Sequence, residues 1–161
     1  MTRVLFVCLG NICRSPMAEA VFRRKVEEAG LTENIQIDSA GTGDWHIGKA
    51  PHEGTRKLLD RRGISYEGMR ARQVTGGDFS QFDYIVCMDT SNERNMNDIR
   101  RSLSEQSPGG AQMLKLLDLM PETGISDVPD PYYTGNFEEV YELVSTGCDR
   151  LLAKIRQEQA M

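Results

Sequence analysis

Short apolar runs alternate with longer segments of mixed polarity along the chain. The residues from Arg3 to Cys8 are almost all apolar, which is typical of a strand buried on both faces of a parallel sheet. From Ile35 to Asp38 apolar and polar residues alternate, which indicates a half-buried strand. Phe82 to Met88 predicts a third strand. Met113 to Leu119 predicts a fourth, although its apolar spacing also fits a helical turn.

The first helix is predicted from Met17 to Ala29, where helix-forming residues present an apolar face. Ser15 is the expected N-cap, and Pro16 follows where the first helical position tolerates proline. Gly30 supplies the C-terminal stop.

Three more helices follow from the same kind of spacing. One runs from Pro51 to Arg62 and ends at Gly63, and another lies near Asn92 to Arg101, with Asp89 or Ser91 as its cap. The last helix has the clearest pattern, because its apolar residues recur three or four positions apart and form one stripe. That stripe consists of Phe137, Val140, Tyr141, Val144, Cys148, Leu151, Leu152 and Ile155.

Strand and helix patterns thus alternate, with loops expected at residues 41–48, 102–110 and 121–135. This order predicts an α/β fold: a four-stranded parallel sheet with helices on both faces, a doubly wound three-layer sandwich. No internal repeat or break in composition divides the chain, so we expect a single domain over residues 1–161. In such sheets ligands bind beyond the carboxyl ends of the strands, where the first strand delivers Cys8.

The charge balance excludes some classes of function. The chain has 19 Lys and Arg against 24 Asp and Glu, a net charge of −5, so we expect no nucleic-acid partner. No apolar run approaches the roughly 20 residues of a membrane span, and the N-terminal apolar run is too short for a signal peptide. We therefore expect a cytoplasmic protein without a membrane partner, whose four cysteines stay reduced.

The segment from Cys8 to Arg14 joins the first strand to the first helix. Its backbone N–H groups are expected to gather at the positive end of that helix and form an anion cradle. A thiol beside a guanidinium and a helix N-terminus is stabilised as a nucleophilic thiolate, and Ser15 could add a hydroxyl donor. The Arg14 guanidinium suits bidentate binding of a phosphoryl group. The segment therefore predicts a phosphate-binding loop with a nucleophile.

This loop, Cys8-Leu9-Gly10-Asn11-Ile12-Cys13-Arg14-Ser15, resembles the C-x5-R-S signature of the low-molecular-weight protein tyrosine phosphatases. C-x5-R alone is moderately specific, but its combination with a distant Asp-Pro-Tyr-Tyr is a strong signal. The similar stretches reach from the first strand to the last loop and cover almost the whole chain. They are Asp-Ser-Ala-Gly-Thr at 38–42, Ala-Arg-Gln-Val at 71–74, Phe-Asp-Tyr-Ile-Val-Cys-Met-Asp at 82–89 and Asp-Pro-Tyr-Tyr at 130–133.

The resemblance implies a mechanism for the matching residues. Cys8 would attack phosphorus and form a cysteinyl-phosphate, while Arg14 and the loop amides would hold the equatorial oxygens. Asp130 would protonate the leaving phenolate and then activate water. Locally, Asp130 also fits a turn residue before Pro131, and Asp127 is its one close competitor for the acid.

The remaining loop residues have supporting roles. Asn11 is expected in left-handed backbone, where it would keep the loop in shape, and Ser39 is expected in the same supporting network. In the family, the cysteine at the position of Cys13 can form a reversible disulfide with the nucleophile, here Cys8. The alternative for Cys13 is a small filler in a tight loop.

Trp45, Tyr132 and Tyr133 would form walls around a flat aromatic ring, as the resemblance implies. The expected substrates are phosphotyrosine-containing proteins, with small aryl phosphates in vitro, and the expected state is a monomer. We expect no cofactor and no metal, because neither His46 nor His52 has metal-ligand spacing with a cysteine or carboxylate.

Three other functions are alternatives. Protein-arginine phosphatases are similar relatives with threonine where this chain has Ile12, and an isoleucine there, with no hydroxyl, favours phosphotyrosine. Arsenate reduction needs two further cysteines close together, whereas Cys87 and Cys148 are expected in the core. A non-catalytic phosphate-binding module would lack the nucleophile or the acid.

Overall fold

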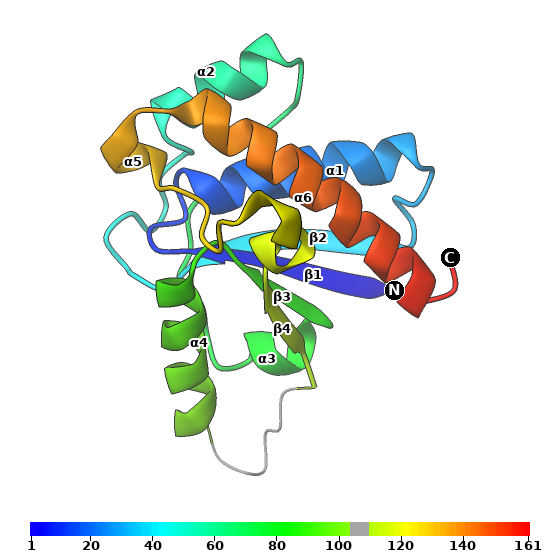
Figure 1. Cartoon of the computed structure of the whole chain (residues 1–161). Helices are drawn as coiled ribbons and strands as arrows, with labels where there is room; N and C mark the ends of the chain where they lie inside the picture. The colour runs from blue at the N-terminus through cyan, green and yellow to red at the C-terminus, as the bar shows by residue number, and fades with distance from the viewer. Residues whose placement is uncertain (104–109) are drawn as a thin grey trace.

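The computed structural model describes residues 1–103 and 110–161, so residues 104–109 of the predicted loop at 102–110 lie outside the described residues. Its centre is a four-stranded parallel sheet in the order β2-β1-β3-β4 (Figure 1). The strands are β1 (Thr2–Cys8), β2 (Ile35–Gly41), β3 (Tyr84–Cys87) and β4 (Gln112–Lys115).

Helices cover both faces of the sheet, as the alternating pattern predicted (Figure 1). In β1, Val4 and Phe6 face a core shared with α1, α2 and α6, whereas Leu5 and Val7 face a second core shared with α3 and α4. All four side chains are fully buried, which explains the unbroken apolar run. The helices are α1 (Arg14–Glu28), α2 (Glu53–Arg61), α3 (Asp78–Gln81), α4 (Thr90–Ser102), α5 (Pro131–Thr134) and α6 (Phe137–Glu158).

The start of α1 differs from the prediction. The helix begins at Arg14 with Cys13 as its N-cap, so Ser15 is not the cap, and Pro16 is the third helical residue rather than the first. Proline fits there because the N–H groups of the first turn have no acceptor within the helix. The Ser15 hydroxyl is therefore available to the preceding loop. Gly30, with φ of +72°, follows the end of the helix as expected.

Other helices and strands also begin or end a few residues from their predicted positions. Asp89, rather than Ser91, caps α4, and its side chain accepts a hydrogen bond from the Asn92 N–H. The ambiguous run from 113 to 119 is strand as far as Lys115 and then becomes the 3₁₀ turn η1 (Leu116–Leu119). The long loop before α6 contains a second such turn, η2 (Pro121–Thr123), and α5, which like α3 is too short to give a periodic pattern.

The stripe predicted for the last helix forms its buried face. Val140, Val144, Cys148, Leu151 and Ile155 have no exposed surface, and α6 packs against α1 and η1. No helix among the described residues is long and apolar enough to cross a membrane.

Gly147 lies on this buried face, and a Cβ there would come within 2.7 Å of Leu116 Cγ. Alanine normally stabilises a helix interior relative to glycine by about 1 kcal/mol. Because the new Cβ would meet the branch point and both methyl groups of the fully buried Leu116, we expect the steric cost to exceed this gain. Gly147→Ala should lower the free energy of unfolding in urea by about 1–3 kcal/mol.

The matched control is the same change in a Leu116→Ala background, where space is available. There Gly147→Ala should be neutral or stabilising. A stabilising effect in the wild-type background would contradict the packing described for α6.

Candidate active site

Three segments far apart in the sequence converge on a pocket of about 330 Å³ at the carboxyl end of β1. They are the loop from Cys8 to Arg14, the loop after β2 and the start of α5. The pocket brings together the expected nucleophile, guanidinium, acid and aromatic walls. Its lining consists of Cys8, Leu9, Gly10, Ile12, Cys13, Arg14, Trp45, His46, Asp130, Tyr132 and Tyr133.

The loop between β1 and α1 has the form of an anion cradle. Asn11 adopts the left-handed conformation, with φ of 55°, which turns the chain around the sulfur of Cys8. Among the described residues, the backbone N–H groups of Gly10, Ile12 and Cys13 have no backbone acceptor. Together with the N-terminus of α1, these groups make the loop suited to a phosphate-sized anion.

The Cys8 sulfur has two neighbours that can donate hydrogen bonds to a thiolate. The Asn11 N–H donates to it at 3.3 Å, and the Ser15 hydroxyl oxygen lies 3.0 Å away. The residue is 97% buried, yet its surface lines the pocket. The sulfur is therefore held at the base of the pocket and faces the position that a phosphorus atom would occupy.

Polar side chains behind the loop hold Asn11 in its left-handed conformation. Its Nδ2 donates to Ser15 Oγ at 2.8 Å and to Ser39 Oγ at 3.0 Å, and its Oδ1 accepts from the Arg72 N–H at 3.0 Å. Asn11, Ser15 and Ser39 are all buried and outside the pocket lining. The amide thus makes three hydrogen bonds, which offset part of the cost of the left-handed backbone.

Arg14 is held chiefly through one nitrogen of its guanidinium. Its Nη1 donates to Asp89 Oδ2 at 2.7 Å and to the Val128 carbonyl at 3.0 Å, so both hydrogens of Nη1 are used. Nε has no hydrogen bond to the described residues, and Nη2 makes only a long contact of 3.4 Å with Asp130 Oδ2, so the Nε–Nη2 edge can take two phosphate oxygens once that contact is displaced. Burial opposes the charge, but the neighbouring Cys8, Asp89 and Asp130 raise the pKa of Arg14 above its ordinary value.

Asp89 is a site residue that the sequence did not indicate as such. The local sequence pattern predicts that Asp89 is the N-cap of α4, and Asp89 does cap that helix. Its second carboxylate oxygen, however, binds Arg14, which is 75 positions away in the chain. The available signal was its place directly after β3, at the same edge of the sheet as Cys8.

Asp130 caps a helical turn and also lines the pocket. It caps α5, where its Oδ1 accepts from the Tyr132 N–H at 3.1 Å, and its Oδ2 lies 3.4 Å from Arg14 Nη2 inside the pocket. Its competitor Asp127 lies outside the pocket and accepts from the N–H and the hydroxyl of Thr90. Although partial burial acts in the opposite direction, these bonds lower the pKa of Asp127, so it remains ionised.

The outer part of the pocket is aromatic. Trp45, Tyr132 and Tyr133 are 65%, 52% and 77% exposed, so their ring surfaces are accessible to a substrate. Tyr132 packs edge-to-face on Tyr133, with centroids 5.2 Å apart. His46, which was not among the expected wall residues, also lines the pocket, and its ring lies 6.4 Å from that of Tyr132.

The other cysteines differ from Cys8 in their surroundings. Burial, together with the charges of Cys8 and Asp130, raises the pKa of Cys13 to about 12. Cys87 and Cys148 lie in the two cores, as expected, and burial raises the pKa of both thiols. Among residues 1–103 and 110–161, no group of three or more histidine, cysteine or carboxylate side chains is placed to hold a metal ion.

A cysteine at the base of an anion cradle, an oriented arginine and a nearby carboxyl group define the site of a cysteine-dependent phosphatase. Residues 3–161 match the family described as "Low molecular weight phosphotyrosine protein phosphatase". The chain therefore belongs to the low-molecular-weight phosphotyrosine protein phosphatase family.

Individual relatives agree with this assignment. The chain is 52% identical to the low molecular weight protein-tyrosine-phosphatase YfkJ of Bacillus subtilis over the whole of both chains. The crystal structure of YfkJ superimposes with a TM-score of 0.91, over 98% of this chain and 96% of that one. A Staphylococcus epidermidis protein-tyrosine-phosphatase, PtpA, is 47% identical over 94% of this chain and 92% of its own length. A structure titled drosophila arginine phosphatase matches at 33% identity with a TM-score of 0.89, over 97% and 98% of the two chains.

The contrast among the cysteines gives a chemical test. In native protein at pH 8, iodoacetamide should add one group per chain, on Cys8, because burial raises the pKa of Cys13 to about 12 and the Cys13 thiol is therefore protonated at this pH. Peptide mapping by mass spectrometry would locate the adduct. Cys8→Ser should take up no label in the same time, whereas labelling of Cys13 as fast as Cys8 would contradict the assignment.

Proposed function

We propose that this protein hydrolyses phosphotyrosine in proteins through a cysteinyl-phosphate intermediate. The observation that carries the proposal is the convergence of Cys8 and Arg14, from the loop between β1 and α1, with Asp130, from the segment before α5, on one pocket. The names of the relatives support the same activity. Because the pocket is complete within one chain, we propose that the protein acts as a monomer.

In the first step, the Cys8 sulfur attacks phosphorus and the bond from phosphorus to the phenolic oxygen breaks. The loop N–H groups and the Nε–Nη2 edge of Arg14 hold the equatorial oxygens, over which charge spreads in the transition state. Protonated Asp130 donates its hydrogen to the departing oxygen. The products of this step are a free phenol and a phosphoryl group on Cys8.

In the second step, Asp130, now a carboxylate, takes a proton from water as the water oxygen attacks phosphorus. The sulfur–phosphorus bond breaks, and inorganic phosphate and the Cys8 thiolate are released. The Ser15 hydroxyl oxygen lies 3.0 Å from the sulfur, so the hydroxyl can donate a hydrogen bond to the thiolate as it leaves. The chain itself thus supplies the nucleophile, the clamp and the acid.

The pocket supports aryl phosphates as the substrate class. The exposed rings of Trp45, Tyr132 and Tyr133 provide surfaces for an aromatic ring. Ile12 lines the pocket without a hydroxyl and packs with Cys13, Ala71 and Phe137. Small aryl phosphates are expected substrates in vitro.

We also propose that Cys13 protects the nucleophile by forming a reversible disulfide with it. Cys13 lies in the same loop, lines the same pocket and is a free thiol. Hydrogen peroxide would oxidise the Cys8 thiolate to a sulfenic acid, and attack by the Cys13 sulfur would form the disulfide and release water. Two equivalents of an external thiol would then reduce the disulfide and restore both cysteines. Since all four cysteines are free thiols and the nucleophile must be reduced, we propose that the protein works in the cytoplasm.

The nucleophile and the acid are tested by substrates that differ in their leaving group. With EDTA present, Cys8→Ser should abolish hydrolysis of both phenyl phosphate and p-nitrophenyl phosphate. Asp130→Ala should lower kcat by about 10²–10⁴-fold on phenyl phosphate and much less on p-nitrophenyl phosphate, whose leaving group needs less protonation.

Asp127→Ala is the matched control for the acid, because its carboxylate lies outside the pocket. It should leave the ratio of the two rates unchanged. Equal losses on both substrates in Asp130→Ala would show that Asp130 is not the acid.

One of the similar structures is that of a drosophila arginine phosphatase, so the choice between phosphotyrosine and phosphoarginine needs its own test. We expect peptides carrying phosphotyrosine to be hydrolysed far faster than the same peptides carrying phosphoarginine. Ile12→Thr should narrow this preference. Faster release of phosphate from the phosphoarginine peptides by the wild-type protein would refute the substrate assignment.

A further inference from the structure

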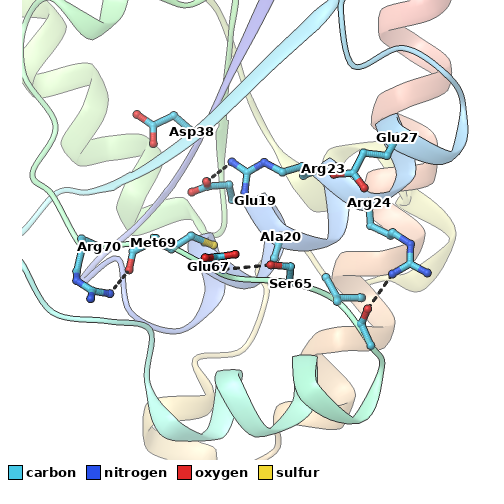
Figure 2. Close-up of a pocket in the computed structure, with 13 residues that line it drawn as sticks. Glu19, Ala20, Arg23, Arg24, Glu27, Asp38, Ser65, Glu67, Met69 and Arg70 are labelled. Atoms are coloured by element: carbon cyan, nitrogen blue, oxygen red, sulfur yellow. Dashed lines mark hydrogen bonds and ion pairs between the residues drawn. The ribbon is translucent and has the colours of Figure 1, made fainter.

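The helix α2 is held at its two ends by different kinds of contact. Just after its C-terminal end, the Gly63 carbonyl accepts from Arg24 Nη1 at 2.8 Å, at the wall of a cavity of about 710 Å³ (Figure 2). This cavity shares no lining residue with the active-site pocket. At the N-terminal end of α2, by contrast, His52 contacts two segments that form that pocket.

The position of His52 is fixed through its backbone and its side chain. Its N–H donates to the Ile12 carbonyl of the phosphate-binding loop at 2.7 Å. Its Nδ1 accepts from the Gly54 N–H at 3.0 Å and so caps α2. The imidazole also stacks on the Phe137 ring, with centroids 5.5 Å apart and 17° between the planes. The His52 ring is therefore tied to the loop, to α2 and to the start of α6.

Gly54 makes this stacking possible. A Cβ at position 54 would lie 2.3 Å from two carbons of the Phe137 ring, so any larger residue would push that ring away from the α2 backbone. Because Gly54 has no side chain, the Phe137 ring packs directly on α2 and gives the His52 ring a fixed support.

The other neighbour of the imidazole is Tyr132, on the segment that carries the acid. The two rings meet edge-to-face, with centroids 5.8 Å apart and 72° between the planes. Outside its own segment, and among the described residues, the other ring beside Tyr132 is that of His46, at 6.4 Å in the loop after β2. His52 is therefore the closer support for Tyr132, and it is anchored to three elements.

Tyr132 in turn orients the Asp130 carboxyl group, because its N–H donates to Asp130 Oδ1 at 3.1 Å. α5 is a single turn in which only Pro131 is buried, so its local bonds do not fix where it lies. The 3.4 Å contact of Asp130 with Arg14 is displaced when a phosphate takes the Nε–Nη2 edge. A shift of Tyr132 would therefore move the acid relative to the Cys8 sulfur.

We propose that His52 is a positioning residue for phosphotyrosine hydrolysis: its ring holds Tyr132, and through Tyr132 the Asp130 carboxyl group, in a fixed place relative to the phosphate-binding loop. The inference rests on the proposed function, in which Asp130 protonates the leaving oxygen. His52 is not part of the pocket lining, so it acts through Tyr132 rather than on the substrate. A misplaced acid costs most when the leaving group needs its proton.

Two substitutions separate the ring of His52 from its role as a helix cap. His52→Asn keeps a side-chain oxygen that can accept from the Gly54 N–H, but it removes the ring. His52→Phe keeps a flat ring between Phe137 and Tyr132, but it has no acceptor for Gly54. Both variants keep the backbone N–H that binds Ile12.

The first readout is kcat/KM for phenyl phosphate divided by kcat/KM for p-nitrophenyl phosphate, because kcat/KM covers the step in which the phenol leaves. In His52→Asn this ratio should fall about threefold to tenfold, as expected from the loss of one edge-to-face ring pair. In His52→Phe it should stay within about twofold of the wild-type ratio. An unchanged ratio in His52→Asn, or equal falls in both variants, would overturn the proposal.

Arg24→Ala is the matched control for a general loosening of α2. It removes the bond to the Gly63 carbonyl at the other end of the helix and leaves the ring contacts of His52 in place (Figure 2). The ratio should equal that of the wild-type protein. A fall as large as in His52→Asn would overturn the proposal, because the anchoring of α2 as a whole would then position the acid.

Amide hydrogen exchange, measured by mass spectrometry on peptides that cover residues 128–136, tests the position of α5 without any turnover. Exchange there should be faster in His52→Asn than in the wild-type protein, and unchanged in His52→Phe and Arg24→Ala. Equal exchange in all four proteins would also overturn the proposal. Absence of hydrolysis by the wild-type protein would instead count against the proposed function, and the exchange rates would still decide whether His52 holds Tyr132.

Discussion

The buried guanidinium of Arg14 is the charge on which the active site depends. It is 97% buried, and its ion pair with Asp89 at 2.7 Å, supported by the Val128 carbonyl, compensates for the lost water. These contacts tie the first residue of α1 to the start of α4 and to the segment that carries Asp130. One buried charge thus brings the carboxyl ends of two strands and the acid-bearing segment to the same place.

Most of the fold follows from periodicity, because burial acts through apolar side chains at regular spacing. β1 and α6 were predicted closely, since β1 is buried on both faces and α6 presents one continuous stripe. The start of α1 was not, because the helix begins after Cys13, which makes no side-chain capping hydrogen bond, while the Ser15 hydroxyl contacts Asn11 and Cys8 instead. Single-turn helices such as α3 and α5 give no periodic signal at all.

Some residues of the active site could likewise be predicted from the sequence, and others could not. A residue that belongs to a clear local pattern, such as Cys8 at the end of a buried strand, could be predicted from the sequence. Asp89 could not, because its local sequence indicates only a helix cap. Its bond to Arg14 joins two positions far apart in the chain, and no local pattern reports it.

The central claim is that Cys8 carries the phosphoryl group during turnover. The most direct measurement is rapid quenching of the protein in denaturant during hydrolysis of p-nitrophenyl phosphate, followed by digestion and mass spectrometry. We predict a phosphoryl adduct on the peptide that contains Cys8, and none in Cys8→Ser. An adduct on another residue, such as His46, or steady turnover by Cys8→Ser, would contradict the account.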